Sequence, residues 1–428
     1  MAAGDWERTL SNAIELEQAG RVAEAIDSTF RLIATDPGCE PAWIFAATTF
    51  CRQGCATEVP AMVDRYHQLS GRGPVLIKEI MNGLLREGWP QVVEALAQTF
   101  PAGHAGHILG LYYRGCARMQ AGDDQGALAL FARFRQDADR YTGIIPFLST
   151  PFFNVIYRQG TLVADSTAFA ADADPGPPAQ PGETPVWPAP ATVPGDRPVL
   201  ACAANNLYFT QFAEGFTRSA AALGLPAVLH FHVINPDPPS RLLMAALAAA
   251  AASGRLGDVA IDFSTAELPA GAGATWFACS RFLAAPALLE AYRAPLWLFD
   301  VDLLLTEALP TLIRQVRDHG RLDVGAFDTG RHEPASRYSA ATVLLNISPG
   351  TRRFLALLAR FIRPRLALPL NANWMLDQAA LYSVICHCRR SEPAITFGDF
   401  RTLTGLTRDD VFVSLHPGGL KNAMRWNP

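Results

Sequence analysis

Lysine is almost absent from this sequence, and so are the segments that direct a chain to a membrane. Only Lys78 and Lys421 occur among its 36 basic residues. The start of the chain has neither a basic region nor an apolar run, so we expect no secretory signal. The longest apolar stretch, Leu242 to Ala252, is far shorter than the roughly 20 residues that a membrane-spanning helix needs.

Cysteine and net charge are low as well. The eight cysteines in 428 residues are too few and too irregularly spaced for a disulfide framework. A formal net charge of -4 shows no bias toward nucleic acid. Half of the residues are apolar, which allows large cores, and the length allows two or three domains. These features predict a cytoplasmic protein with no transmembrane segment and no nucleic-acid partner.

The first third of the chain carries a repeat of 34 residues. Its markers are four glycines, each followed after five residues by a small or β-branched residue and after twelve by a large one. The glycines are Gly20, Gly54, Gly88 and Gly122, the small or β-branched residues are Ala25, Val59, Val93 and Ala127, and the large residues are Leu32, Tyr66, Phe100 and Phe134. Glycine suits a tight turn between paired helices. The pattern resembles the tetratricopeptide repeat over residues 6–140.

This resemblance predicts a helical repeat domain over residues 1–164, with residues 141–164 as a capping helix and tail. A plain helical bundle with a chance period is the alternative. The next segment, residues 165–198, reads as a linker, because Pro175 to Pro198 holds nine prolines in 24 residues. Such a composition favours extended chain and cannot build a core.

Residues 199–428 alternate strands and helices, which predicts an α/β sheet domain. We expect strands at 199–202, 227–233 and 295–299, and helices at 208–223 and from residue 240 onward. In open sheets of this kind, ligands bind at the carboxyl ends of the strands.

Two carboxylates follow the apolar run Leu296–Phe299, at Asp300 and Asp302. Neighbouring acids repel each other and are costly to bury unless a cation neutralises them. On extended chain, residues two apart point to one face, where a divalent cation would clamp a diphosphate. The run resembles the Asp-x-Asp motif of glycosyltransferases with the GT-A fold.

Further segments, in the same order along the chain, resemble glycosyltransferase family 8 and its nucleotide-diphospho-sugar transferase relatives. They are residues 204–208, 280–289, 339–346, 374–381 and 415–421. The resemblance implies a Rossmann-like GT-A domain over residues 199–428 that uses Mn²⁺ or Mg²⁺ and a nucleotide sugar, with a UDP-sugar as the expected donor. It assigns the metal to Asp300, Asp302 and His416, donor contacts to Asn205, Tyr208, Arg281 and Lys421, and catalytic roles to Asp377 and Gln378.

The chain departs from the family pattern at three positions. Asn205 stands where an acid is usual, Ser339 where asparagine is usual and Ala341 where glycine is usual. The departures at Ser339 and Ala341 leave the identity of the donor sugar open.

Each candidate residue also has a plain structural interpretation. Asp300 and Asp302 would form a solvated turn, and Asp377 and Gln378 would cap a helix. His416 would lie in a Pro-Gly turn. Arg281 would form a surface ion pair with Glu290 or another acid, and Tyr208 would occupy a core position. Two further groups look like metal ligands, namely His230 with His232 on one strand face, and Cys386-His387-Cys388. We expect both to be structural, because the spacing of a zinc site is missing.

The leading hypothesis is therefore a metal-dependent transferase that moves a sugar from a nucleoside diphosphate to an acceptor hydroxyl, with retention of configuration implied by the resemblance. The helical repeats would hold a protein or glycan acceptor. The main alternative is a repeat-based interaction scaffold with an inactive transferase-like domain. A nucleotidyltransferase is a third interpretation of the Asp-x-Asp motif.

Overall fold

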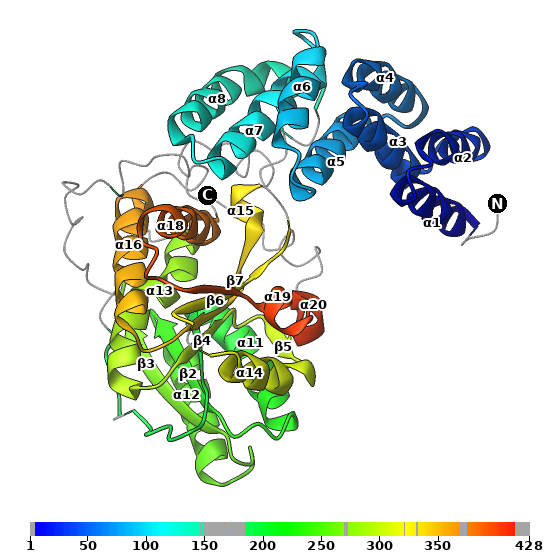
Figure 1. Ribbon diagram of the computed structural model, residues 1–428. Coiled ribbons are helices and arrows are strands. Elements are labelled where there is room, and N and C mark those ends of the chain that lie inside the picture. Colours follow the sequence, from blue (N-terminus) through cyan, green and yellow to red (C-terminus); the bar gives the residue numbers. More distant parts are fainter. Residues whose placement is uncertain are drawn as a thin grey trace. The chain divides into compact units, whose positions relative to one another are not determined.

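The structure is a computed structural model of the 428-residue chain (Figure 1). It describes residues 5–145, 148, 169, 185–189, 191–268, 273–320, 322–330, 333–367 and 375–415. The chain divides into two compact units: residues 1–165 with 330–334, and residues 166–329 with 335–428. The first unit is helical and the second is built around a mixed sheet. The predicted order of a helical part followed by an α/β part is therefore confirmed.

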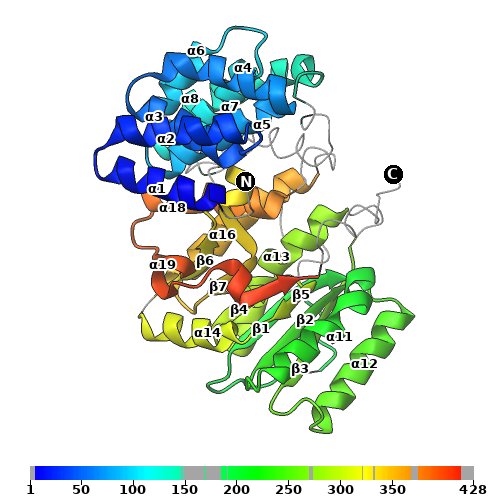
Figure 2. The same cartoon turned by 90° about the vertical axis from the view of Figure 1, so that its right-hand side faces the viewer.

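The N-terminal unit is a series of helix pairs (Figures 1 and 2). In chain order the helices are α1 (Asp5–Gln18), α2 (Val22–Thr35), α3 (Glu40–Arg52), α4 (Val59–Ser70), α5 (Gly73–Arg86), α6 (Pro90–Thr99), α7 (Ala105–Gln120) and α8 (Asp124–Asp137), with short 3-10 turns at Ala56–Glu58 and Ala138–Tyr141. The capping helix expected over residues 141–164 lies almost wholly outside the described residues.

The four glycines of the 34-residue period lie in the turns that join the helices of each pair. Their φ angles are +77°, +78°, +82° and +82° for Gly20, Gly54, Gly88 and Gly122. No atom lies within 4 Å of the place where a Cβ would stand. The left-handed backbone, which costs other residues about 1–2 kcal/mol, is therefore the reason for glycine. The residues five positions later are fully buried, which lets the paired helices approach closely.

The second unit contains a seven-stranded sheet with the order β3-β2-β1-β4-β7-β6-β8. The strands are β1 (Val199–Asn205), β2 (Val228–Ile234), β3 (Ala260–Ala266), β4 (Leu296–Phe299), β6 (Val324–Asp328), β7 (Tyr338–Leu345) and β8 (Phe397–Asp399). Strands β3, β2, β1 and β4 are parallel, β7 is antiparallel to β4 and β6, and β8 is parallel to β6. Every residue of β2 is buried, as is typical of a parallel strand covered on both faces.

Helices cover both faces of this sheet (Figures 1 and 2). The described helices of this unit are α11 (Asn206–Ala222), α12 (Pro238–Ala252), α13 (Ala274–Tyr292), α14 (Ala308–Asp318), α15 (Pro334–Arg337), α16 (Pro349–Leu366), α18 (Leu376–Ser391), α19 (Phe400–Thr404) and α20 (Arg408–Val411), of which α15 is a single turn before β7 and α20 packs on α14 and on strand β9 (Phe412–Ser414). On one face Phe216 of α11 and Leu309 of α14 pack with Phe299 of β4 in one apolar core. On the other face α13 packs on β1 and β2, and α16 and α18 pack on α13.

A second, two-stranded sheet joins distant parts of the chain. Strand β5 (Leu303–Leu305) pairs antiparallel with β9 (Phe412–Ser414). Strand β5 begins directly after Asp302, so this small sheet adjoins the carboxylate pair.

The described part of the predicted linker packs on the sheet instead of standing apart from it. Val186 forms a β-bridge with Thr265 of the edge strand β3, and Trp187 packs against His230. Thr192 donates two hydrogen bonds to Asp262, from its amide and its hydroxyl. The second half of the Pro-rich segment is therefore part of the α/β unit. Among the described residues, no helix is long and apolar enough to cross a membrane.

Candidate active site

The predicted site residues that are described gather where β1 and β4 end. These two strands are parallel neighbours, with Cys202 beside Phe299, so their carboxyl ends open at one edge of the sheet. From β1 the chain proceeds outward to β2 and β3, and it then returns to place β4 on the other side of β1. Ligands of open α/β sheets bind at such a reversal of strand order. The position of the acids therefore agrees with this general rule.

The two acids lie in a turn that is held at both ends. The amide of Asp300 donates to the carbonyl of Ala341 in β7, at 3.2 Å. The carbonyl of Asp302 accepts from the amide of Leu415, at 2.9 Å. The side chain of Asp300 is about one-third exposed, whereas Asp302 is only 7% exposed. The interpretation of the pair as a solvated turn is therefore wrong for Asp302.

Arg281, on α13, connects this turn to the start of α18. Its Nη1 contacts Oδ1 of Asp300, and its Nη2 donates to Oδ2 of Asp377 at 2.7 Å. Arg281 is 4% exposed, so the alternative interpretation of a surface ion pair with Glu290 is wrong, and the predicted contact with the donor stays a prediction. Its Nε is buried and has no hydrogen-bond partner among the described residues. Such a donor is costly to leave unsatisfied and is available to a bound ligand or water.

Burial controls the ionisation of this cluster. It raises the pKa of Asp377, the Asp300 charge adds to this rise, and Arg281 opposes it. Burial by itself would lower the pKa of Arg281, but the charges of Asp300 and Asp377 outweigh it and raise that pKa. The carboxyl therefore loses more from burial than it gains from its partner. Arg281 thus binds two carboxylates, those of Asp300 and Asp377, and the carboxylate of Asp302 belongs to the same turn as that of Asp300.

Asn205 and Tyr208 form the β1 side of the site. Asn205 is the last residue of β1 and caps α11, because its Oδ1 accepts from the amide of Tyr208 at 2.9 Å. Burial raises the pKa of the Tyr208 phenol, and the charges of Asp302 and Asp300 raise it further. The phenol thus lies close to both acids. It is half-buried and its ring packs on Phe212, so it is partly core and partly site.

The remaining predicted residues are less defined. Gln378 follows Asp377 in the first turn of α18 and is half-buried. Met375, which precedes that helix, has φ +58°, so the chain turns sharply into it. His416 and Lys421 lie outside the described residues. Within the described part of the chain, no group of three or more His, Cys, Asp or Glu side chains is placed to hold a metal ion.

The histidines of β2 belong to a buried hydrogen-bond network. His230 bonds Tyr292 at 2.7 Å and Ser264 at 2.9 Å, and His232 bonds Ser264 at 2.8 Å. Tyr292 in turn donates to Asp262, which holds Thr192. Burial lowers the pKa of His232 to about 4. These contacts agree with the predicted structural role, as does the stacking of His387 on Phe169 at 4.4 Å.

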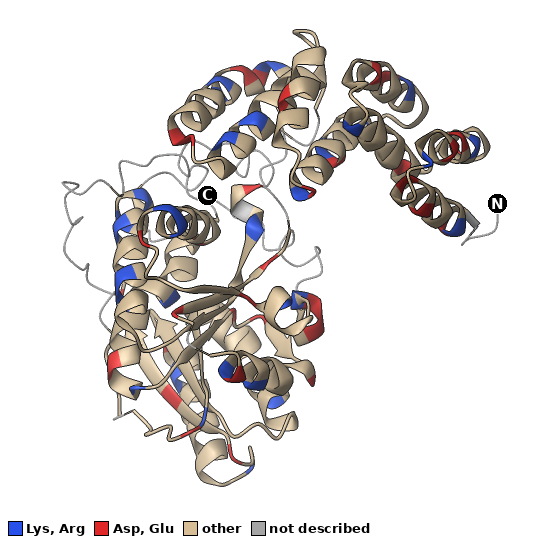
Figure 3. Ribbon diagram, in the orientation of Figure 1, with Lys and Arg blue, Asp and Glu red and all other residues tan. Residues whose placement is uncertain are grey.

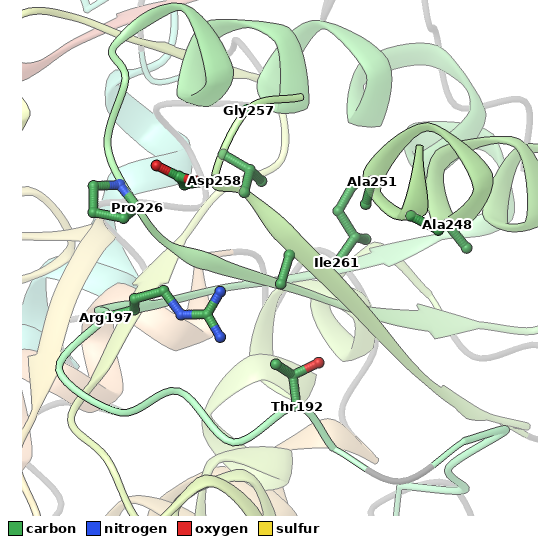
Figure 4. A pocket seen from close by; sticks show the side chains of 11 residues that line it. Thr192, Arg197, Pro226, Ala248, Ala251, Gly257, Asp258 and Ile261 are labelled. Carbon is green, nitrogen blue, oxygen red and sulfur yellow. The ribbon is translucent and has the colours of Figure 1, made fainter. Parts of the chain in front are cut away.

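A solvent-open cavity of about 520 Å³ lies elsewhere, at the amino ends of β2 and β3 (Figure 4). Pro226 and Val259, which precede the two strands, line it together with Ile261 of β3, and Ala248 and Ala251 line it from α12. Parallel strands have their amino and carboxyl ends at opposite edges, so this cavity is not part of the acid cluster.

No family model and no curated protein matches the chain. The solved structures that match include the crystal structure of mouse xyloside xylosyltransferase 1 in its apo form. It is 14% identical, covers 47% of this chain and 84% of its own, and has a TM-score of 0.30. Similarity at this level determines neither the fold nor the activity of the chain.

Proposed function

We propose that the α/β unit is a glycosyltransferase that moves a sugar from a nucleoside-diphosphate donor to an acceptor hydroxyl. The observation that carries the proposal is the acidic turn of Asp300 and Asp302 at the reversal of strand order, where Arg281 joins Asp300 to Asp377. It supports a site for a divalent cation together with an anionic substrate. The Asp-x-Asp resemblance agrees with this.

The residues present fit Mn²⁺ or Mg²⁺, because both ions prefer carboxylate oxygens and Mn²⁺ also accepts imidazole. Asp300 and Asp302 would hold the ion, with His416 as the proposed third ligand. The hydrogen bond from Leu415, the residue before His416, to Asp302 supports this assignment. When bound, the cation would neutralise charge on the departing diphosphate.

The protein side chains take separate roles in this proposal. Tyr208 and Asn205, at the end of β1, bind the nucleoside. Arg281 fixes the carboxylates of Asp300 and Asp377 relative to each other, and its buried Nε is a further donor toward the substrate. The remaining residues keep the roles that the resemblance implies. Asp377 binds the donor sugar, Gln378 lies near its anomeric carbon, and Lys421 binds the diphosphate.

The site lies wholly within the α/β unit, so donor binding requires no contribution from the helical unit. We further propose that the helix pairs recruit a protein or glycan acceptor, as repeat arrays with extended surfaces commonly do. Tethering would raise the local acceptor concentration, to about the millimolar range for a short flexible connection.

Calorimetric titration with UDP and the other nucleoside diphosphates, each with and without Mn²⁺, tests the proposal. The wild type is expected to bind one of them with Mn²⁺ dependence, and Asp302→Asn is expected to weaken that binding more than about tenfold. Asp318→Asn, an exposed acid on α14, is the matched control and should bind like the wild type. Equal Mn²⁺-dependent affinity in the wild type and Asp302→Asn would remove the metal assignment. Absence of any nucleotide binding would favour the scaffold alternative.

A further inference from the structure

A chain of hydrogen bonds runs from β2 to the edge strand β3 on the side of the sheet that α13 covers. His232 bonds the hydroxyl of Ser264 at 2.8 Å, and this hydroxyl bonds His230 at 2.9 Å. His230 bonds the phenol of Tyr292 at 2.7 Å, and the phenol bonds Asp262 at 2.9 Å. All of these side chains except that of Asp262 are buried. We call the five residues the relay.

Asp262 fixes the direction of every hydrogen bond in the relay. An ionised carboxylate can only accept, so the Tyr292 hydroxyl donates to it. The phenol oxygen then accepts from Nδ1 of His230, and Nε2 of the same ring, which carries no proton, accepts from Ser264. The Ser264 oxygen in turn accepts from Nδ1 of His232. The last acceptor, Nε2 of His232, is buried and has no hydrogen-bond partner among the described residues.

Asp262 also holds the strap, by which we mean the described residues 185–189 and 191–198 of the Pro-rich segment. Thr192 of the strap donates to its carboxylate at 2.7 Å from the amide and at 2.6 Å from the hydroxyl. Thr192 and Arg197 also line the solvent-open cavity beside α12 (Figure 4). Because β3 is an edge strand, the strap covers a sheet edge, which would otherwise be open to pairing, together with one wall of this cavity.

Few charges surround the relay. Asp262 is the one charged residue of β1, β2 and β3 (Figure 3), and β1 places Ala201 and Ala203 beside the two histidines. The charged residues of the adjoining segments are either exposed or bonded to backbone carbonyls, and they are Asp196, Arg197, Asp258, Glu290 and Arg293. Among the described residues no cation pairs with Asp262, so its charge is held by Tyr292 and Thr192.

The relay has a second, equally bonded state that contains one more proton. A proton that arrives at Nε2 of His232 releases the Nδ1 proton to Ser264, and each group passes one proton on until Asp262 is protonated. Every bond is then reversed: Asp262 donates to Tyr292, the phenol to His230, Nε2 of His230 to Ser264, and Ser264 to Nδ1 of His232. One proton has been taken up and only the carboxylate has changed charge. Neither ring stays charged, in agreement with the burial that lowers the pKa of both histidines.

We propose that the relay is a pH-sensitive latch, which holds the strap on β3 while Asp262 is ionised and releases it when the relay takes up one proton. Hydrogen bonds to a charged acceptor are about twice as strong as those between neutral groups. Protonated Asp262 therefore binds Thr192 more weakly through both of its hydrogen bonds. Release uncovers the edge of β3 and the cavity beside α12, whereas the histidines remain hydrogen-bonded and the sheet stays intact.

Hydrogen exchange of the full chain at pH 7 and pH 4.5, read by mass spectrometry, tests the latch. After correction for the intrinsic exchange rate, protection of residues 185–198 should fall about tenfold at pH 4.5, as expected when two charge-assisted bonds become neutral. Protection of β4 should not change. Asp262→Asn, which is neutral at both pH values, should show the loss already at pH 7. Asp258→Asn is the matched control, because this acid is exposed just before the same strand, and it should behave like the wild type.

The ring nitrogens give a second readout that does not depend on the variants of Asp262. In long-range proton–nitrogen spectra at pH 7, both histidines should be Nδ1–H tautomers, identified by the signals that vanish in His230→Gln and His232→Gln. An Nε2–H tautomer of either ring, strap protection that is the same at both pH values, or equal losses in Asp262→Asn and Asp258→Asn would each overturn the proposal. If Asp262→Asn does not fold, the wild-type exchange and the tautomers still decide.

Discussion

Replacing Arg281 by methionine removes the only cation that contacts Asp377 in the described structure, and its cost can be estimated from the burial of that carboxyl. The Asp377 side chain is 8% exposed and accepts from Arg281 at 2.7 Å. Methionine fills much of the arginine stem, so the main loss is the charge. Asp300 also loses its partner, but at 35% exposure its carboxylate remains solvated and contributes little.

Two limits bound the destabilisation. Breaking a buried ion pair costs about 3–5 kcal/mol when the remaining charge stays ionised. The carboxyl can instead take up a proton, which at pH 7 costs about 4 kcal/mol for an ordinary carboxyl with a pKa near 3.9. The variant follows whichever process has the smaller free-energy cost. We therefore expect the free energy of unfolding to fall by about 3–4 kcal/mol at pH 7. At pH 5 protonation costs only about 1.5 kcal/mol, and the loss should shrink to that size.

The sign of this pH dependence follows from linkage. Without Arg281, the pKa of Asp377 in the folded state rises further above its unfolded value. The contribution of this group to stability is then fully present below the unfolded pKa and is lost as pH rises from the unfolded pKa through the folded pKa. The variant should therefore approach the wild type as pH falls from 7 to 5.

Urea unfolding at pH 7 and pH 5 measures the effect as a shift of the midpoint at constant slope. Arg293→Met is the matched control, because Arg293 ends the same helix and is exposed; it should stay within about 0.5 kcal/mol of the wild type. Asp377→Asn added to Arg281→Met should recover most of the loss. A loss below about 1 kcal/mol at pH 7, unchanged at pH 5, would refute the idea that Arg281 balances a buried charge.

Three further predictions follow from the fold and the proposed site. Deleting residues 1–164 should leave donor hydrolysis intact but raise the apparent KM for a protein or glycan acceptor, and an unchanged KM in a steady-state transfer assay would exclude recruitment by the helical unit. Gly54→Ala should cost about 1–2 kcal/mol in thermal unfolding because φ is +78°, whereas Gly83→Ala, inside α5 with ordinary contacts, should be neutral or stabilising. Burial holds the pKa of His232 near 4, below its ordinary value of 6.5, and lowers the pKa of His230 as well, so stability should fall as pH drops from 6.5 to 4, and His232→Gln should reduce this fall without abolishing it.

Local and periodic features were predictable from the sequence. The 34-residue spacing of glycines identified four interhelical turns, because left-handed backbone is a local demand on one residue. The apolar run before Asp300 identified β4, and its acids lie at a strand end as expected. In both cases the local structure is determined by interactions among residues that lie close together in the sequence.

Features that depend on distant contacts were not predictable. Arg281 and Asp377 are 96 positions apart, and no spacing in the sequence indicates that they pair. The arginine was instead expected to touch the donor or a surface acid. The Pro-rich composition suggested a linker, yet Trp187 and Thr192 pack on the sheet, because two well-placed side chains are enough to anchor extended chain.

The pairing of β5 with β9 sets an order in time during synthesis. The turn that carries Asp300 and Asp302 leaves the ribosome with β5, long before residues 412–415 exist. Until then the carbonyl of Asp302 has no amide from Leu415 to hold it, and the edge of β5 is open. A nascent chain can thus complete most of its sheet while the acid turn is still loose. The proposed cation site would mature last, so a chain that ends before β9 would fold its seven-stranded sheet but would leave the acid turn without its partner strand.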